Sequence, residues 1–406
     1  MKERLKAPEL RFPGFTDYWV QRKLGDLIEE KWIVRQSDGN HGNLYPRSEE
    51  FVDSGVPYVA ASNISSDGNS IDFSTVKYLP QRRADLFKKG VAFDGDILLA
   101  HNATVGPVLR LHTSFDKVIL STTLTLYRVD SEKIDPDFFL QNLRSSMFQN
   151  QLFETMKQST RNQVPILAQQ KLSISITSNL DEQERIGKLL TLLDDLIATN
   201  QRKLDLLKEQ KKGYLQKMFP KNGAKVPELR FAGFTDAWEL RKSKELCTIS
   251  TGKGNTQDKV DDGAYPFYVR SATIEKSDEY LYDQEAVLTV GDGVGTGKVY
   301  HYVNGKYNLH QRVYRMYDFK DVSAKYFYYY FSNNFYKRVM SMTAKTSVDS
   351  VRMEMIADMN IVFPSVKEQE NIVELFSNLD NTIALHQRKL DLLKEQKKGF
   401  LQKMFV

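Results

Sequence analysis

The glycine-rich segment at residues 290–300, VGDGVGTGKVY, is the first candidate for chemistry. A glycine-rich turn can wrap phosphate groups, but the phosphate-loop pattern requires a glycine five residues before its final Gly-Lys pair. Counting back from Gly297 gives Asp292, and Thr296 stands where a dinucleotide fingerprint would place its third glycine. The spacing therefore predicts a mobile loop between two strands, which could touch a nucleic acid, rather than a nucleotide site.

Other catalytic signatures are missing from the sequence. The chain has one cysteine, Cys247, and six histidines, none of which forms an H-x-x-x-H pair. A single thiol can form neither an internal disulfide nor a cysteine-based zinc site. No two prolines are adjacent, so the Asp/Asn-Pro-Pro-aromatic motif of amino-methyltransferases is absent. We expect no catalytic residue, no metal and no cofactor on this chain, although scattered Asp and Glu do not exclude a nuclease site.

Polar side chains in loops rich in Gly, Asn and Asp are the remaining candidates. Arg and Lys suit guanine edges, Asn and Gln suit adenine, and all of them can hold phosphates. The predicted contacts in the first half are His101, Asn102, Thr104, Arg161, Asn162 and Gln163. Those in the second half are Lys253, Asn255, Arg270, Lys298, His310, Gln311, Arg312, Lys345 and Thr346. Any one of them could equally be an ordinary loop residue, and a net charge of +5 permits nucleic acid without requiring it.

Two internal repeats show how the chain must position these loops. PELRFPGFTDYWVQRK at 8–23 recurs as PELRFAGFTDAWELRK at 227–242, with 12 of 16 positions identical. NQRKLDLLKEQKKGYLQKMF at 200–219 recurs at 386–405 with 18 of 20 identical. The chain is therefore two half-proteins in tandem, whose near-identical segments flank divergent middles.

The middles, residues 24–180 and 243–366, have matching cues in the same order. Examples are DILLAHNATVGPV at 96–108 beside AVLTVGDGVGTGKV at 286–299. Short β-rich runs, turn residues and one or two helices predict an α+β fold that occurs twice with two different surfaces. The tyrosines at 326 and 328–330 could be a stacking platform, but a helix buried against the sheet is the favoured interpretation.

The second repeat predicts two long helices. Apolar residues recur at alternating steps of four and three over about five heptads, which is typical of a coiled coil. The predicted seam is Ile186, Leu190, Leu193, Ile197, Asn200, Leu204 and Leu207 in one helix, and Ile372, Phe376, Leu379, Ile383, His386, Leu390 and Leu393 in the other. Because both helices lie in one chain, we expect an antiparallel coiled coil with a pseudo-two-fold internal repeat.

Polar positions on these helices suggest two further roles. Asn200 and His386 occupy equivalent seam positions, where one polar residue often fixes register, although both could face solvent instead. The outer faces are nearly identical in the two copies, which indicates that two copies of one partner dock there, although a recent duplication would give the same pattern. A helix over residues 181–219 would be about 58 Å long, enough to act as a ruler between two DNA-reading domains.

The predicted domains are a first recognition domain at 1–180, a helix and linker at 181–221, a second recognition domain at 222–366 and a second helix at 367–406. No apolar run approaches the length of a membrane span, and the first residues lack the apolar core of a secretory signal. We therefore expect a reduced, cytoplasmic protein with no membrane partner.

With its two P-E-L-R-F-x-G-F-x-x-x-W motifs, its two EQE segments at 182–184 and 368–370, and its two lysine-rich helices ending in KMF, the chain resembles the specificity subunit of type I restriction-modification systems. The resemblance implies that each middle reads one half of a split double-stranded DNA target. It also implies that two modification subunits dock on the helices and methylate adenine with S-adenosylmethionine. Two restriction subunits, with ATP and Mg, would complete the complex. This chain would supply recognition and scaffolding only.

Two other functions remain open on the residues alone. A structural adaptor would explain the coiled coil and the paired docking faces, but not why the middles diverged while the helices stayed alike. A self-sufficient DNA enzyme would need the catalytic motifs that are missing. Salt-dependent DNA binding by the complex would separate the adaptor from a DNA reader.

Overall fold

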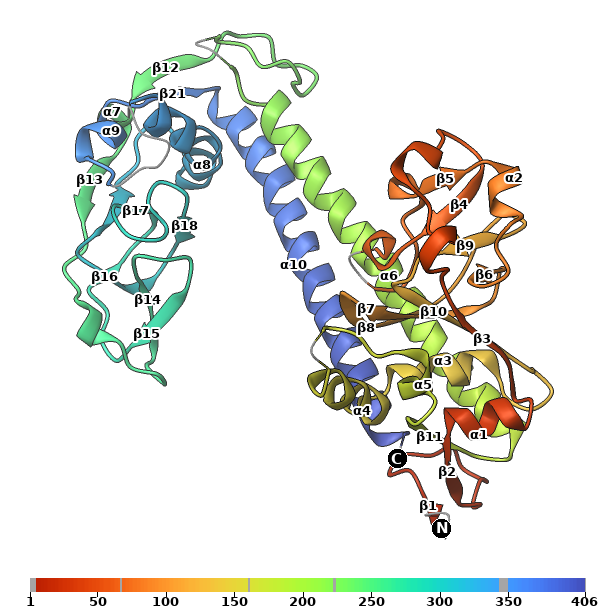
Figure 1. Ribbon diagram of the computed structural model, residues 1–406. Coiled ribbons are helices and arrows are strands. Elements are labelled where there is room, and N and C mark those ends of the chain that lie inside the picture. The colour runs from red at the N-terminus through yellow and green to blue at the C-terminus, as the bar shows by residue number, and fades with distance from the viewer. Residues whose placement is uncertain (1–4, 66–67, 160, 222–223, 343–349, 406) are drawn as a thin grey trace. The chain divides into compact units, whose positions relative to one another are not determined.

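The computed structural model describes residues 5–65, 68–159, 161–221, 224–342 and 350–405 (Figure 1). The chain forms two compact units, Met1–Arg202 with Arg388–Val406, and Lys203–Gln387. Each unit therefore combines one of the two divergent middles with part of each long helix. The domain boundaries predicted from the sequence follow the helix ends, whereas the division into units falls within both helices.

The first unit is built from short strands and helices. Its strands are β1 (Leu5–Lys6), β2 (Trp19–Lys23), β3 (Ile33–Asp38), β4 (Val56–Val59), β5 (Lys77–Leu79), β6 (Val91–Ala92), β7 (Ile97–Asn102), β8 (Thr104–Arg110), β9 (Val118–Leu120), β10 (Leu124–Val129) and β11 (Ser173–Ile176). Its helices are α1 (Leu24–Glu29), α2 (Gln81–Ala84), α3 (Pro136–Arg144), α4 (Ser146–Lys157), α5 (Ile166–Gln169) and the start of α6 (Leu180–Lys217). The strands form sheets in the orders β3-β10-β7-β8, β5-β4-β9-β6 and β1-β2-β11.

The second unit repeats this topology. Its strands are β12 (Glu239–Lys242), β13 (Thr248–Thr251), β14 (Tyr265–Tyr268), β15 (Ile274–Ser277), β16 (Tyr282–Asp283), β17 (Ala286–Val290), β18 (Tyr300–Val303), β19 (Lys306–Leu309), β20 (Val313–Tyr317) and β21 (Asn360–Phe363). Its helices are α7 (Ser243–Leu246), α8 (Ala324–Ser341), α9 (Met353–Ala357) and the start of α10 (Val366–Lys403). The sheet orders β13-β20-β17-β18 and β15-β14-β19-β16 match those of the first unit strand for strand. The prediction of one α+β fold occurring twice is confirmed.

The pairing details agree as well. β4 runs parallel to β9, and β14 runs parallel to β19, while the other pairs of these sheets are antiparallel. Gly39 and Gly252 occupy the same close approach: a Cβ there would lie 2.3 Å from a backbone atom of Ser121 and 2.2 Å from one of Leu309. Only glycine fits such a contact between two backbones. The shared glycine therefore marks the same packing in both units.

The predicted aromatic helix is α8. Ser323 caps its N-terminus by accepting a hydrogen bond from the backbone N–H of Tyr326, as N-cap residues do. Tyr326, Tyr329 and Tyr330 are buried in a core that also contains Trp238. These tyrosines therefore fill the interior, and the preferred interpretation of the run is confirmed over the exposed stacking platform.

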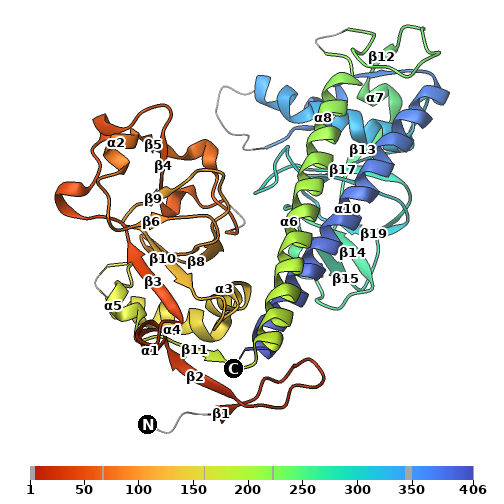
Figure 2. The ribbon, with the colours of Figure 1, turned by 90° about the vertical axis from the view of Figure 1, so that its right-hand side faces the viewer.

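The two long helices run side by side in opposite directions (Figure 1 and Figure 2). In the first unit, Lys397 of α10 donates a hydrogen bond to the Asp194 carboxylate of α6. In the second unit, Lys211 of α6 lies 2.5 Å from the Asp380 carboxylate of α10. The residue numbers fall along one helix as they rise along the other, so the pair is the predicted antiparallel coiled coil.

Most of the predicted seam is buried. The buried members are Ile186, Leu190, Leu193, Ile197, Asn200, Leu204, Ile372, Phe376 and Leu390. The half-buried members are Leu207, Leu379, Ile383, His386 and Leu393. Asn200 donates its amide hydrogen bond to the carbonyl of Leu196, 2.7 Å away on its own helix. The two Lys–Asp pairs are contacts between the helices that can fix their register.

In each unit, one copy of the first repeated motif contacts both the C-terminal end of one long helix and the N-terminal start of the other. In the first unit, Leu10 N–H donates to the carbonyl of Lys403 at the end of α10, with N and O 3.0 Å apart. Arg11 donates to the buried Glu182 at the start of α6. Trp19 packs on Phe405, with ring centroids 6.1 Å apart. The N-terminal motif is therefore held by residues at the far end of the sequence.

The second unit makes the same contacts with its own copy of the motif. Leu229 N–H donates to the carbonyl of Lys217 at the end of α6, at 2.9 Å. Arg230 donates to both carboxylate oxygens of the buried Glu368, at 2.7 and 2.8 Å. The near-identity of the two motif sequences is explained by these equivalent contacts with the helix ends. In the second unit a short stretch of chain joins motif and helix end, whereas in the first unit the two lie at opposite ends of the chain.

Candidate nucleic-acid interface

The first contact surface forms where the β7–β8 hairpin meets the segment that follows α4. Ala103, at the hairpin tip, has φ 63°, a left-handed conformation that is uncommon outside glycine. Its N–H donates to the carbonyl of Asn162 at 2.9 Å, and Asn102 and Gln163 form a β-bridge. Two segments about sixty residues apart in the sequence are thereby placed together.

Five of the six predicted contacts of the first unit lie on this surface. Arg161, Asn162 and Thr104 are exposed, while Asn102 and Gln163 are half-buried. Three amides, a hydroxyl and a guanidinium within one small surface can donate to phosphates and to base edges. We call the set Asn102, Thr104, Arg161, Asn162 and Gln163 the first contact surface.

The second contact surface is built from the equivalent parts of the second unit. Gln311 donates from its amide to the Asn255 side chain at 2.9 Å. Asp292, in the β17–β18 hairpin, lies 3.5 Å from Arg270 Nη1 and 3.7 Å from Arg312 Nε. The glycine-rich segment is thus a loop between two strands, as predicted, and its aspartate holds two exposed guanidinium groups in place.

The other predicted residues of the second unit are spread more widely. Lys253 is exposed in the same loop as Asn255. Lys298 turns to α8, where its ammonium lies 5.0 Å from the ring centroid of Tyr336. Lys345 and Thr346 lie outside the described residues. We call the set Lys253, Asn255, Arg270, Gln311 and Arg312 the second contact surface.

Burial corrects the prediction for two histidines. His101 and His310 are 5% and 4% exposed, so their rings cannot reach a groove in this conformation. Burial lowers the pKa of His101 to about 4, so its ring is neutral at pH 7 and offers no cation to a phosphate. The His310 ring accepts a hydrogen bond from the N–H of Arg312 at 3.0 Å and so supports the turn beneath the exposed guanidinium.

Comparing the two units adds residues that the sequence did not single out. His41 lies two residues after Gly39, in the loop that corresponds to the loop of Gly252 and Lys253, and the His41 side chain is 66% exposed. Thr122 follows the end of β9 as Gln311 follows the end of β19, and its carbonyl lies 3.5 Å from the Asn102 amide. The order of similar cues in the two halves was the signal that could have found both.

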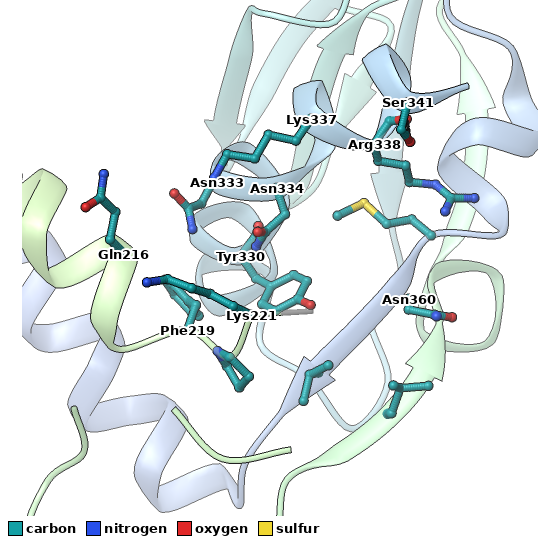
Figure 3. A pocket seen from close by; sticks show the side chains of 14 residues that line it. Gln216, Phe219, Lys221, Tyr330, Asn333, Asn334, Lys337, Arg338, Ser341 and Asn360 are labelled. Atoms are coloured by element: carbon teal, nitrogen blue, oxygen red, sulfur yellow. Dashed lines mark hydrogen bonds between the residues drawn. The ribbon is translucent and has the colours of Figure 1, made fainter. Parts of the chain in front are cut away.

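A polar pocket in the second unit lies apart from these residues (Figure 3). It opens between the end of α6, helix α8 and the β12–β21 pair, and Lys221, Asn333, Lys337 and Arg338 point into it. Its lining contains amides, cations, the phenol of Tyr330 and the hydroxyl of Ser341, but no carboxylate, imidazole or thiol. None of the residues predicted to contact DNA lines this pocket.

Among the residues that the structure describes, neither a group of metal ligands nor a membrane-spanning helix is present. No three side chains among His, Cys, Asp and Glu gather there in a way that could hold a metal ion. None of the helices there combines the length and the apolar character needed to cross a bilayer.

Comparisons with known proteins agree with this architecture. The family model described as the type I restriction modification DNA specificity domain matches residues 17–209 and 235–395, one segment in each half. The EcoDI specificity subunit of Escherichia coli is 26% identical over 165 residues, which are 41% of this chain and 36% of that protein. The MjaVIII specificity subunit of Methanocaldococcus jannaschii is 23% identical over 249 residues, 55% of this chain and 59% of that protein. The chain thus matches less than two thirds of the length of either relative.

A solved structure shares the fold over nearly the whole chain. The type I restriction-modification S subunit from M. genitalium matches with a TM-score of 0.69 and 14% identity, covering 99% of both chains. Identity at that level establishes the fold, while the sequence match establishes the family. The chain belongs to the type I restriction-modification DNA specificity family.

Proposed function

We propose that this chain is the DNA-reading and scaffolding subunit of a type I restriction-modification complex, without catalysis of its own. Each unit reads one half of a split, asymmetric target in double-stranded DNA through its own contact surface. The observation that carries the proposal is the combination of the same strand order in both four-stranded sheets with different exposed side chains at the same loops. One fold that presents two different hydrogen-bonding surfaces suits a target whose two halves differ in sequence.

The cofactors of the complex belong to its other subunits in this proposal. Two modification subunits use S-adenosylmethionine to methylate adenine, and two restriction subunits use ATP and Mg. The complex works in the cytoplasm, where the DNA is. The relatives that support this proposal are themselves described as specificity subunits.

Methylome sequencing tests the proposed function. Cells that express this chain with its cognate modification subunit are compared with cells from which this chain is deleted. We expect a split adenine-methylated motif that disappears in the deletion. An unchanged methylome, with the complex shown to be assembled, would contradict DNA reading and favour the adaptor alternative.

We predict that the two contact surfaces act independently. Arg161→Ala should weaken recognition of the first half-site by about 5- to 150-fold, since one contact to a base contributes about 1–3 kcal/mol. Arg312→Ala should do the same for the second half-site. If either guanidinium contacts a phosphate instead, its loss weakens all targets and lowers the salt slope of binding by about one. Methylation of targets with single-base changes measures both effects. A change at the half-site of the other unit would contradict the assignment.

A matched pair of exposed leucines supports scaffolding. Leu206 of α6 in the second unit is 69% exposed, and its counterpart Leu392 of α10 in the first unit is 55% exposed. Each directly precedes a seam position, so both repeats carry an exposed apolar side chain at the same place beside the seam. Exposed apolar side chains at identical places in two repeats favour two copies of one helical partner.

We predict that Leu206→Glu and Leu392→Glu each weaken the binding of one modification subunit by about tenfold or more, because a charge replaces apolar surface buried on docking. Native mass spectrometry should then show one modification subunit per chain with either variant and none with both. Lys208→Ala, at an exposed position two residues along and so on the opposite side of α6, is the matched control and should keep both. Two modification subunits on the double variant would refute docking at these leucines.

A further inference from the structure

A buried polar network lies behind the first contact surface. Gln169, the last residue of α5, is fully buried. Its amide nitrogen donates to the carbonyl of Val164 at 2.7 Å and to the hydroxyl of Thr125 at 3.0 Å. Its amide oxygen accepts from the hydroxyl of Tyr127 at 2.6 Å. Both donors of the glutamine are therefore used, each on a different element of the fold.

These bonds connect the two segments that form the first contact surface. Val164 directly follows Gln163, and its N–H donates to the carbonyl of His101 at the end of β7, at 2.8 Å. The Thr125 hydroxyl lies 3.0 Å from Nδ1 of His101, and since it already accepts from Gln169 it has its own hydrogen to donate to that ring. Gln169 thus reaches the loop through Val164 and the hairpin through Thr125 and His101.

In the second unit a different side chain donates to the carbonyl of Val351, which is equivalent to the carbonyl of Val164. Val351 N–H donates to the carbonyl of Gly291, at the end of β17, at 2.7 Å. The hydroxyl of Tyr314 donates to the carbonyl of Val351 at 3.2 Å. Tyr314 is the second residue of β20, as Thr125 is the second residue of β10, and the residue equivalent to Gln169 is the buried Ile356. Although the side chains have changed, the valine between loop and hairpin is fixed at both N–H and C=O in both units.

We propose that Gln169 and Tyr314 are positioning residues for DNA reading. By holding the carbonyl of Val164 or Val351 from behind, each sets where its contact surface lies relative to the hairpin. A misplaced amide or guanidinium cannot make two well-aligned hydrogen bonds to one base edge, so selectivity suffers more than binding. This inference rests on the proposed function and names residues that touch no DNA.

The test uses the chain assembled with its modification subunit and a DNA library in which single bases of both half-sites are changed. Gln169→Met keeps the length of the side chain but removes its hydrogen bonds, and Tyr314→Phe removes one hydroxyl. We expect Gln169→Met to lower the ratio of cognate to changed-site methylation about tenfold at the first half-site only. Tyr314→Phe should do so at the second half-site only, so each variant controls the other. Loss of folded protein alone would lower all methylation and leave the ratios unchanged.

Hydrogen exchange provides a readout that does not involve DNA. In Gln169→Met the amide of Ala103, which donates to Asn162, should exchange about ten times faster or more, because the loop is no longer pinned. Faster exchange with unchanged ratios would overturn the positioning role. Unchanged ratios for Gln169→Met and for Arg161→Ala would instead overturn the first contact surface itself. If Gln169→Met does not assemble, Tyr314→Phe decides, and an unchanged second half-site would overturn the proposal.

Discussion

Replacing Phe405 with alanine should cost the first unit about 3–5 kcal/mol of its free energy of unfolding, the usual range for a buried phenylalanine. Phe405 is the last residue but one of the chain, yet it is 4% exposed. Its ring centroid lies 5.6 Å from that of Phe138 and 6.1 Å from that of Trp19. The cavity would therefore open in the core of the N-terminal recognition domain. Denaturant unfolding followed by hydrogen exchange, peptide by peptide, measures the loss unit by unit.

Phe219→Ala is the matched control for this prediction. Phe219 occupies the same place in the second unit, with ring centroids 5.7 Å from Tyr326 and 5.8 Å from Phe376. It should destabilise the second unit by a similar amount and leave the first unchanged. If Phe405→Ala instead weakened mainly the second unit, the association of the two chain ends would be wrong.

Arg230→Ala should destabilise the second unit by about 3–5 kcal/mol, because it leaves the buried carboxylate of Glu368 without its charge partner. Glu368 is 1% exposed and accepts both bonds of the guanidinium. The repeated motif would then lose its anchor on the start of α10. Urea denaturation of the intact chain, read in the second unit, measures the change.

The double variant Arg230→Ala with Glu368→Ala supplies the control. With both partners gone no charge is stranded, so the double variant should be more stable than Arg230→Ala alone. Arg11→Ala should reproduce the effect in the first unit, where Glu182 is equally buried. Additive losses in the double variant would show that the two groups do not act as a pair.

The architecture could be predicted because it is repeated and periodic. A heptad seam reports burial through spacing alone, which is why Ile186, Leu190, Ile372 and Phe376 are buried as expected. The two divergent middles contain similar sequence segments in the same order, and from this order we predicted that one fold occurs twice. The Lys–Asp pairs could not be predicted in the same way, since Lys211 and Asp380 are 169 residues apart and only the paired helices bring them together.

The contact surfaces were predicted less completely. His101 and His310 lie next to Asn and Gln in the sequence and resemble loop residues, but both are buried, His101 within β7 and His310 directly after β19. Gln169 carries no signal in the sequence, because a single glutamine is ordinary and its importance comes from its hydrogen bonds to Val164 and to two residues of β10. Local composition identifies the exposed members of a surface, whereas the residues that hold it from behind depend on tertiary contacts.

The meeting of the two chain ends in the first unit has a consequence for synthesis on the ribosome. Domains generally fold from the N-terminus as the chain emerges. Here residues 388–406 belong to the first unit, while the second unit ends at residue 387. The N-terminal domain is therefore the last to be completed, after the domain that follows it. A transcript that stops between codons 388 and 405 would yield a finished second domain and a first domain whose core still lacks Phe405.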